Sequence, residues 1–224
     1  MVIRYRIGYW AICDWGSGLC DEAIVGLYER HAREFDRDRG RSLQERAWLD
    51  KFLGFVRPSG TVLDLGCGMA EPIARYIIEA GFSVVGIDSS PSLIDMCRAR
   101  FPQSAWHVAD MRTLTLGRRF DGILAWDSFF HLNRRDQHAM FDQFALHAAQ
   151  GAALMFTSGR SDGEMIGEYC GEPLYHSSLE PQAYRDLLGN TGCAVRYYVA
   201  DDPECGQHTV WVATYDRAWR KPSD

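Results

Sequence analysis

The stretch from Thr61 to Pro72, TVLDLGCGMAEP, decides the fold of this chain. A short apolar run reaches Asp64, passes through Gly66 and Gly68, and opens a helix whose first turn suits Pro72. Glycine permits a tight turn and lets a ligand approach the backbone without a Cβ in the way. The order of strand, acid, glycine loop and helix predicts a nucleotide-type pocket at the carboxyl end of a parallel strand.

A second apolar run, residues 83–87, indicates which kind of nucleotide. It ends in Asp88, about 20 residues past the glycines, and an acid at that separation can accept hydrogen bonds from both ribose hydroxyls. A dinucleotide loop normally has a third glycine where Glu71 stands, and this carboxylate would repel a pyrophosphate at the helix start. An adenosine ligand that carries a sulfonium and an amino group would tolerate these acids.

This pattern resembles the class I S-adenosylmethionine-dependent methyltransferases. Residues 62–69 match the first motif of that family, acid-x-Gly-x-Gly-x-Gly, with Ala70 in place of the third glycine. Further strands that end in acids are expected at 106–111 and 120–127, so the ordered match covers about a third of the chain. The resemblance implies a doubly wound, Rossmann-like α/β fold. It also implies a seven-stranded sheet with an antiparallel last strand, and S-adenosylmethionine as the cofactor.

The resemblance also implies a set of cofactor-binding residues at the carboxyl ends of the first four strands. They are Asp64, Gly66, Cys67, Gly68, Asp88, Ser89, Asp110, Met111 and Trp126. Asp64 and the glycine loop would hold the methionine part, Asp88 the ribose, and Ser89 would flank the adenine. Asp110 would meet the exocyclic amine of the adenine and the Met111 N–H a ring nitrogen. The Trp126 backbone carbonyl would accept from the cofactor amino group.

Composition favours a small acceptor. The chain has 224 residues, 46% of them hydrophobic, which suits one domain with a full core. Its net charge of -6 and the lack of a Lys/Arg tract argue against nucleic acid as a partner. Neither a signal peptide nor a membrane span is expected. The seven cysteines have no C-x-x-C pair, which predicts reduced thiols in the cytoplasm, and histidine spacing predicts no metal site.

The chain is expected to form one domain, residues 1–224, with four parts. Residues 1–57 would form an N-terminal helical cap in which Tyr28, Phe35 or Trp48 could close the pocket, and residues 58–157 the cofactor-binding core. Residues 158–178 would be a long glycine-hinged substrate lid loop. Residues 179–224 would supply a helix, started by a capping box from Ser177 to Glu180, and an antiparallel hairpin.

Two histidines are candidates for a catalytic base. His131 follows the fourth strand, and His176 follows Tyr175 in the lid loop. Histidine titrates near neutral pH, so either could take a proton from an acceptor, and the sequence does not rank them. Asp127 stands near the place of the Asp/Asn-Pro-Pro-aromatic motif of nucleic-acid amino methyltransferases, but both prolines are absent and that reading is declined.

The predicted function is transfer of a methyl group to an oxygen or nitrogen of a small molecule by in-line displacement, without a metal. Aromatic residues near the predicted site, at Trp126, Phe129, Phe130 and Tyr175, suggest an aromatic acceptor. One alternative is a nicotinamide-dependent oxidoreductase, which Glu71 and the terminal hairpin oppose. The other is a non-catalytic module that binds S-adenosylmethionine.

Overall fold

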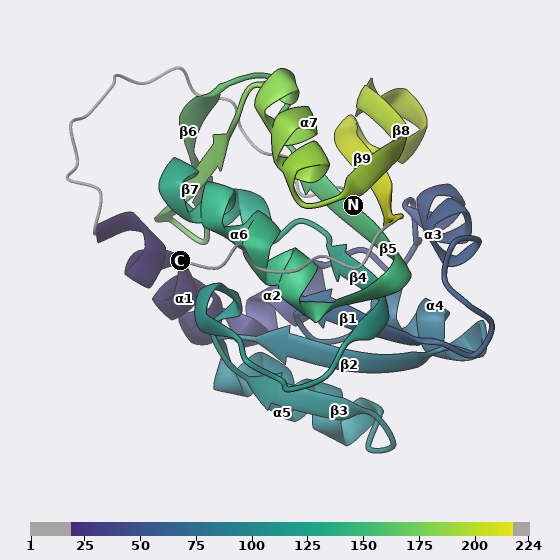
Figure 1. The fold of residues 1–224 in the computed structure, drawn as a ribbon. Coiled ribbons are helices and arrows are strands. Elements are labelled where there is room, and N and C mark those ends of the chain that lie inside the picture. The colour runs from purple at the N-terminus through teal and green to yellow at the C-terminus, as the bar shows by residue number, and fades with distance from the viewer. Residues whose placement is uncertain (1–18, 217–224) are drawn as a thin grey trace.

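The computed structural model describes residues 19–216 of the chain. Its elements follow one another as α1 (Leu19–Arg30), α2 (Ala32–Asp38), α3 (Arg46–Leu53), β1 (Thr61–Leu65), α4 (Ile73–Glu79), β2 (Ser83–Asp88), α5 (Pro91–Arg100), β3 (Ala105–Val108), η1 (Met111–Thr113), β4 (Phe120–Ala125), η2 (Phe129–His131), α6 (Arg134–His147), β5 (Ala148–Ser158), β6 (Gly163–Tyr169), β7 (Glu172–Ser178), α7 (Pro181–Asn190), β8 (Cys193–Asp202), η3 (Pro203–Cys205) and β9 (His208–Tyr215), where η marks a 3-10 turn (Figure 1).

The main sheet has seven strands in the order β3-β2-β1-β4-β5-β9-β8. The first five run parallel, whereas β9 is antiparallel to both of its neighbours, β5 and β8. The chain order reverses between β1 and β4, which is where an open parallel sheet leaves a crevice at its carboxyl edge. The predicted fold, with the last strand inserted antiparallel beside the fifth, is confirmed.

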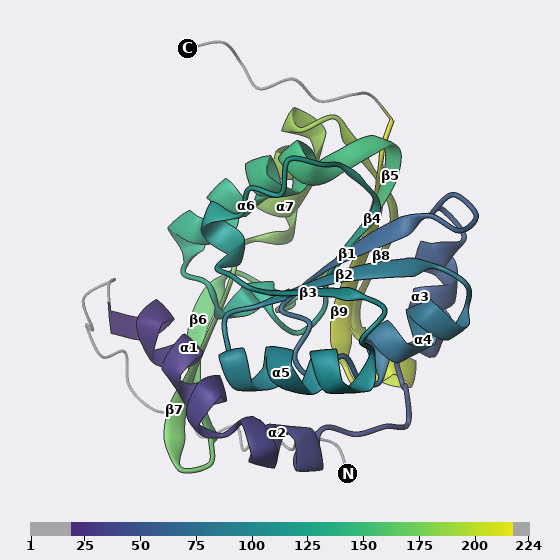
Figure 2. The ribbon, with the colours of Figure 1, turned by 90° about the horizontal axis from the view of Figure 1, so that it is seen from below.

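Helices cover both faces of this sheet. Figure 2 shows α3, α4 and α5 on one side and α6 and α7 on the other. Alternate residues of β1 therefore enter different cores: Val62 packs with Phe52 of α3, and Leu63 packs in the core that contains Phe141 of α6. Because both faces are buried, the central strands read as continuous apolar runs, which is the signal seen in the sequence.

Two helix starts follow from the local sequence. The Ser90 side chain caps α5 by accepting from the Leu93 N–H at 3.2 Å, with Pro91 in the first turn. Asn133 caps α6 by accepting from the Asp136 N–H at 2.9 Å. Each cap satisfies a backbone donor that has no partner within the helix.

The segment 158–178 corrects two predictions. It is not a structureless loop: β6 and β7 pair antiparallel, and Cys170 and Gly171 form the two-residue turn between them with φ of 52° and 81°. A turn with two positive φ values matches the right-handed twist of the flanking strands. The predicted capping box is also wrong, because Ser177 belongs to β7 and α7 begins only at Pro181.

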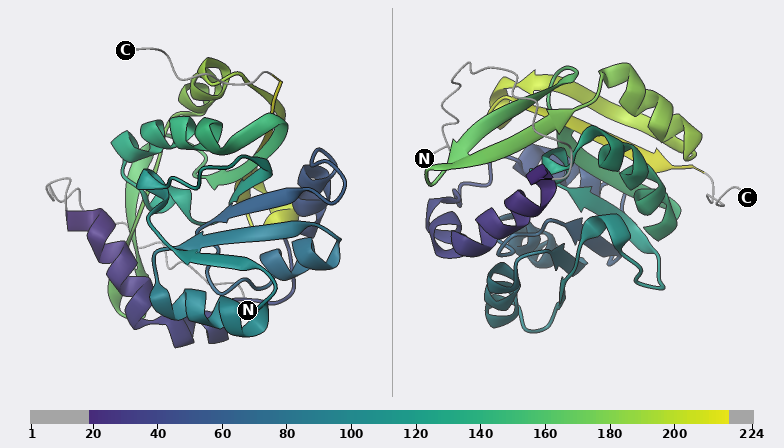
Figure 3. Two further views of the ribbon diagram at one scale, coloured as in Figure 1. Left: turned by 60° about the horizontal axis from the view of Figure 1, so that its bottom comes forward. Right: turned by 90° about the vertical axis from the view of Figure 1, so that its left-hand side faces the viewer.

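The N-terminal helices lie at the carboxyl edge of the sheet. One continuous apolar stripe predicts a single helix from Ile24 to Phe35, but the structure breaks it at His31 into α1 and α2. The hairpin β6–β7 runs beside α1, as both views of Figure 3 show. None of the described helices is long and apolar enough to cross a membrane.

Candidate functional site

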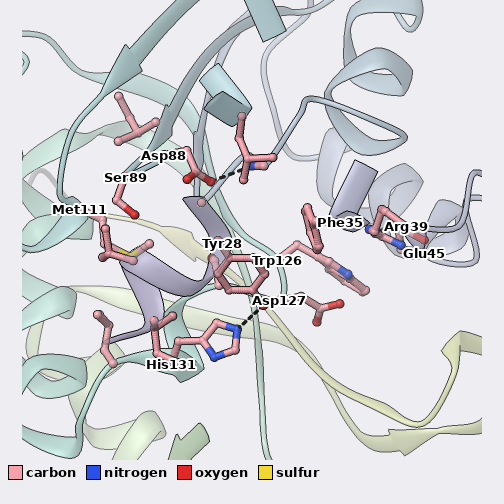
Figure 4. A pocket seen from close by; sticks show the side chains of 18 of the residues that line it. Tyr28, Phe35, Arg39, Glu45, Asp88, Ser89, Met111, Trp126, Asp127 and His131 are labelled. Atoms are coloured by element: carbon pink, nitrogen blue, oxygen red, sulfur yellow. Dashed lines mark hydrogen bonds and ion pairs between the residues drawn. The ribbon is translucent and has the colours of Figure 1, made fainter. Parts of the chain in front are cut away.

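A cavity lies at the carboxyl edge of the sheet, below the N-terminal helices. Its volume is about 210 Å³, many times the roughly 10–15 Å³ that one water needs. Loops after β1, β2, β3 and β4 form its floor, and Tyr28 and Phe35 from α1 and α2 form its roof (Figure 4). Trp48 lies elsewhere: its indole N–H donates to Asp202 at 2.7 Å and its ring is buried in the core.

The structure brings most of the predicted site residues together. The following line the cavity: Gly66, Gly68, Asp88, Ser89, Asp110, Met111, Trp126 and His131. Three others, Asp64, Cys67 and His176, are not among the residues that line it. Of the four aromatic residues behind the prediction of an aromatic acceptor, only Trp126 lines the cavity; Phe129, for example, is fully buried in the core.

Gly66 and Gly68 form a cradle that a larger residue would disturb. Both have positive φ, 76° and 53°. A Cβ on Gly66 would lie 2.3 Å from the Cβ of Ser128, and a Cβ on Gly68 would lie 3.2 Å from Cε1 of Phe35. The Ser128 hydroxyl is itself fixed by donating to the Leu65 carbonyl at 2.7 Å. The loop therefore leaves its backbone open to a ligand, as the sequence predicts.

Asp88 lies at the end of β2 with both carboxylate oxygens oriented by backbone N–H groups. Oδ2 accepts from Gly68 and Oδ1 from Ser90, each at 2.9 Å. Burial raises the pKa of Asp88 to about 6, although these N–H groups act in the opposite direction. Ser90 also donates to Glu29 of α1, which contacts Ser92 as well. The cap therefore holds the loop that presents Asp88.

Asp64 and Cys67 support the cavity floor from behind. Asp64 is 3% exposed, and burial, together with the nearby Asp88 charge, raises its pKa to about 7. Burial also raises the pKa of the Cys67 thiol, which lies next to Cys97. The five cysteines from Cys67 onward, all within the described part of the chain, are free thiols.

Asp110 is held by a neighbouring arginine. Its carboxylate caps the turn η1 by accepting from the Arg112 N–H at 2.8 Å, and the Arg112 guanidinium forms an ion pair with it at 2.7 Å. The same arginine reaches Asp136 of α6 at 3.1 Å. These contacts fix the wall of the cavity at the end of β3, where Ala109 and Met111 also face the ligand space.

The structure distinguishes the two histidines that are candidates for a catalytic base. His131 Nδ1 lies 2.8 Å from the Tyr175 carbonyl and so carries the proton, which leaves Nε2 to accept from the Tyr28 hydroxyl at 3.1 Å. His131 lines the cavity, and burial lowers its pKa. His176 packs behind it, with ring centroids 4.8 Å apart, and burial lowers its pKa to about 3. His131 is therefore the better placed of the two to receive a proton.

Comparison of the sequence with known protein families supports the same fold. A methyltransferase domain family matches residues 62–151, which contain the glycine loop and the strands that form the cavity floor. Over these residues the chain is similar to a methyltransferase domain. The resemblance read from the first motif is confirmed, and so is the strand order typical of this domain.

Relatives of this methyltransferase domain are distant. One segment is 30% identical over 91 residues to dTDP-3-amino-3,6-dideoxy-alpha-D-glucopyranose N,N-dimethyltransferase of Streptomyces fradiae, covering 40% of this chain and 35% of that protein. Another match, to trans-aconitate 2-methyltransferase of Azoarcus sp. (strain BH72), is 26% identical over 164 residues and covers 71% of this chain and 62% of that protein. The chain thus spans about a third of the first relative and less than two thirds of the second.

Solved structures show the same fold over most of the chain. The 1,6-didemethyltoxoflavin-N1-methyltransferase of Burkholderia thailandensis has a TM-score of 0.67 at 17% identity, with 95% of this chain and 94% of that chain covered. At 17% sequence identity, this similarity shows a shared fold. It extends beyond the matched domain to both the cap and the terminal strands.

Two charged pairs at one end of the cavity do not follow from the sequence motifs. His208, at the start of β9, lies 3.0 Å from Asp127 (Nε2 to Oδ2), and Arg39 donates to Glu45 at 2.7 Å. All four residues line the cavity. The predicted terminal hairpin could have indicated His208. A strand inserted antiparallel beside β5 begins at the carboxyl edge of the sheet, so its first residue faces the site.

Glu71 corrects an argument from the sequence. Its carboxylate lies among three arginines, Arg41, Arg75 and Arg100, and the Arg41 contact is 2.9 Å. The charge that was expected to repel a pyrophosphate is therefore compensated within the protein. The sheet order and the family match, rather than the charge of Glu71, oppose a dinucleotide ligand. Within residues 19–216 no group of three or more His, Cys, Asp or Glu residues is arranged to hold a metal ion.

Proposed function

We propose that this chain transfers a methyl group from S-adenosylmethionine to a nitrogen or oxygen of a small molecule. The observation that supports this best is the Gly66–Gly68 cradle beside Asp88, under a roof of cap residues, in a domain of methyltransferase fold. The relative that methylates an amino sugar and the structure named for a small heterocycle favour a small acceptor. The cytoplasmic location stays a prediction.

The cavity suits the predicted cofactor in three respects. The glycine cradle would accept the methionine part close to the backbone. Asp88 keeps lone pairs for a ribose while its orientation is fixed by Gly68 and Ser90. Ser89 and Met111 line the far end, where an adenine would lie. When bound, the sulfonium supplies an electrophilic methyl group.

The residues of the chain would act mainly by position and by exclusion of water. Tyr28 and Phe35 roof the cavity, and His131 offers Nε2, through its hydrogen bond to the Tyr28 hydroxyl, as a proton acceptor. The hairpin β6–β7 holds His131 from behind, because the Tyr175 carbonyl fixes its Nδ1 proton. No residue of segment 158–178 lines the cavity, so a lid function for it stays a prediction.

Two measurements test this function. Calorimetric titration with S-adenosylhomocysteine and with NADH should show binding of the first alone, and the reverse result would support the oxidoreductase alternative. Incubation with methyl-labelled S-adenosylmethionine and a pool of phenols, amines and thiols should move label into product. Binding of the cofactor without any transfer would favour the non-catalytic module.

A further inference from the structure

The Asp127–His208 pair stands where β4 and β9 meet the cavity. Nε2 of His208 faces Asp127 at 3.0 Å, and its Nδ1 faces the Cys205 carbonyl at 2.6 Å. Both partners are acceptors, so both ring nitrogens carry protons and His208 is an imidazolium. The Trp126 ring lies against it with centroids 5.2 Å apart. The pair therefore keeps Asp127 ionised in the cavity wall: His208 balances its charge at Oδ2, and a ligand would be bound through Oδ1.

Asp127 is held in place by its backbone as well. Its φ is 48°, in the left-handed region that costs energy for any residue with a Cβ and that Asp tolerates better than most. Its N–H donates to the Thr157 hydroxyl at 2.9 Å, and that hydroxyl donates to Oδ1 at 3.3 Å. Strand β5 thus fixes the main chain while β9 fixes the carboxylate, and the side chain remains part of the cavity lining.

We propose that Asp127, fixed as an anion by His208, binds the acceptor through an amine, which makes nitrogen the methylated atom. This rests on the proposed function and narrows its acceptor class. Asp127 lines the same cavity as the Tyr28–His131 pair. An ammonium bound to Asp127 would give one proton to Nε2 of His131, directly or through the Tyr28 hydroxyl, and become a nucleophilic amine.

Charge movement explains why the anion favours nitrogen. Methyl transfer to a neutral amine forms an N–C bond, breaks the S–C bond with its electron pair left on sulfur, and moves the positive charge from sulfur to nitrogen. A carboxylate at the acceptor stabilises that developing charge. A phenol or alcohol must instead become an oxyanion, whose formation a neighbouring carboxylate opposes by raising the acceptor pKa. Glu45, 3% exposed in the same wall, adds a second carboxylate, which Arg39 balances.

Matched acceptors test the amine assignment. The probes are pairs that differ only in the reacting atom, such as benzylamine with benzyl alcohol and aniline with phenol, in the presence of methyl-labelled S-adenosylmethionine. Label should enter the amine of at least one pair at a rate tenfold or more above its hydroxyl partner. Calorimetry with S-adenosylhomocysteine runs in parallel: failure to bind would overturn the proposed function itself. Binding together with label on the hydroxyl members, or on no member, would overturn the amine assignment alone.

Variants separate binding from folding. Asp127→Asn keeps the shape but removes the charge, and should weaken calorimetric binding of benzylamine to the S-adenosylhomocysteine complex by tenfold or more. Asp162→Asn removes a carboxylate paired with Arg134 outside the cavity and should leave that binding unchanged. Equal binding of benzylamine by both variants would overturn the role of Asp127. Affinity for S-adenosylhomocysteine reports whether each variant is folded.

His208 acts on the acceptor through Asp127 and is a positioning residue. The titrating and charged groups that face Asp127 are His208, Arg39, His131 and His176. In His208→Gln the imidazolium is lost, so the pKa of Asp127 should rise and amine binding should weaken as the pH falls toward 5. The unmodified protein should show a smaller loss, limited to the part that protonation of His131 causes. A parallel pH dependence in both proteins would remove His208 from the proposal.

Discussion

The N–H of Gly68 donates to Oδ2 of Asp88 at 2.9 Å, which ties the glycine loop after β1 to the acid after β2. The two motifs that the sequence places 20 residues apart thus form a single unit. A ligand that contacts one of them is held against the other. The Ser90 N–H donates to the other oxygen, Oδ1, and so helps to hold the carboxylate in the same orientation.

Removal of the Asp88 carboxylate tests this unit. Asp88→Ala should weaken binding of S-adenosylhomocysteine by about 1.5–3 kcal/mol, because polar groups of ligand and loop lose charged hydrogen-bond partners. Asp95→Ala is the matched control, since its side chain is 74% exposed on α5 and forms an ion pair with Arg98. Titration calorimetry measures both. Undiminished affinity in Asp88→Ala would show that the ribose assignment is wrong.

The glycine cradle makes a prediction about shape. Gly66→Ala should abolish binding of S-adenosylhomocysteine and destabilise the fold by about 1–3 kcal/mol, because φ is positive and the new Cβ meets Ser128. Gly189→Ala in α7 has open space and ordinary helical φ, so it should leave both properties unchanged or slightly improved. Urea unfolding and calorimetry check the pair. Full binding by Gly66→Ala would mean that the ligand does not approach this loop.

Asp64 makes the cofactor site sensitive to pH. Its pKa, raised to about 7, means that the folded protein binds more protons than the unfolded chain between about pH 4 and 7. The free energy of unfolding should therefore fall as pH rises through this window. A ligand with an ammonium group favours the ionised acid, so affinity for S-adenosylhomocysteine should rise toward pH 7, by at most about tenfold per pH unit.

Asp64→Asn provides the control for this pH dependence. The amide does not titrate, so both the free energy of unfolding and the affinity for S-adenosylhomocysteine should depend less on pH. The pH dependence that remains belongs to Asp88, whose pKa is also raised, to about 6. Urea unfolding at several pH values and calorimetry over the same range measure the two slopes. An unchanged slope in the variant would assign the titration to another group.

The local sequence predicts those parts of the structure that depend on contacts between neighbouring residues. Ser90 and Asn133 cap the helices that follow them, and the apolar runs form the strands in the expected order. The turn at Cys170 and Gly171 shows the opposite case. The sequence predicts a hinge at this glycine, because the alternation of apolar and polar residues on either side is too weak to reveal two strands.

The rest of the site depends on contacts between residues far apart in the chain. The sequence shows only the charge of Glu71, whereas the fold surrounds that carboxylate with arginines from three segments. His208 and Asp127 are separated by 81 positions, and only the insertion of β9 beside β5 brings them together. Such pairings follow from topology, so sequence motifs predict the cofactor end of the cavity better than its acceptor end.

The Tyr28–His131 hydrogen bond leads to the last prediction, which concerns the base. His131→Gln should lower kcat by about 10²–10⁴-fold for an acceptor that must lose a proton. His176→Gln should change it by less than tenfold, because that ring lies outside the cavity. Burial lowers the pKa of His131, so the rate should rise with pH through a value below 6.5 and then level off as the neutral form fills.

The pH profile distinguishes a base from a packing residue. The acid limb is the part of the profile in which the rate rises with pH. Loss of His131 should lower the rate and abolish this limb, whereas a variant that is merely less stable would keep the limb at reduced amplitude. Tyr28→Phe deletes the hydroxyl that contacts Nε2 and should change kcat more than affinity for S-adenosylhomocysteine. If His131→Gln retained both rate and acid limb, the acceptor would reach the site already deprotonated, and position alone would account for the catalysis.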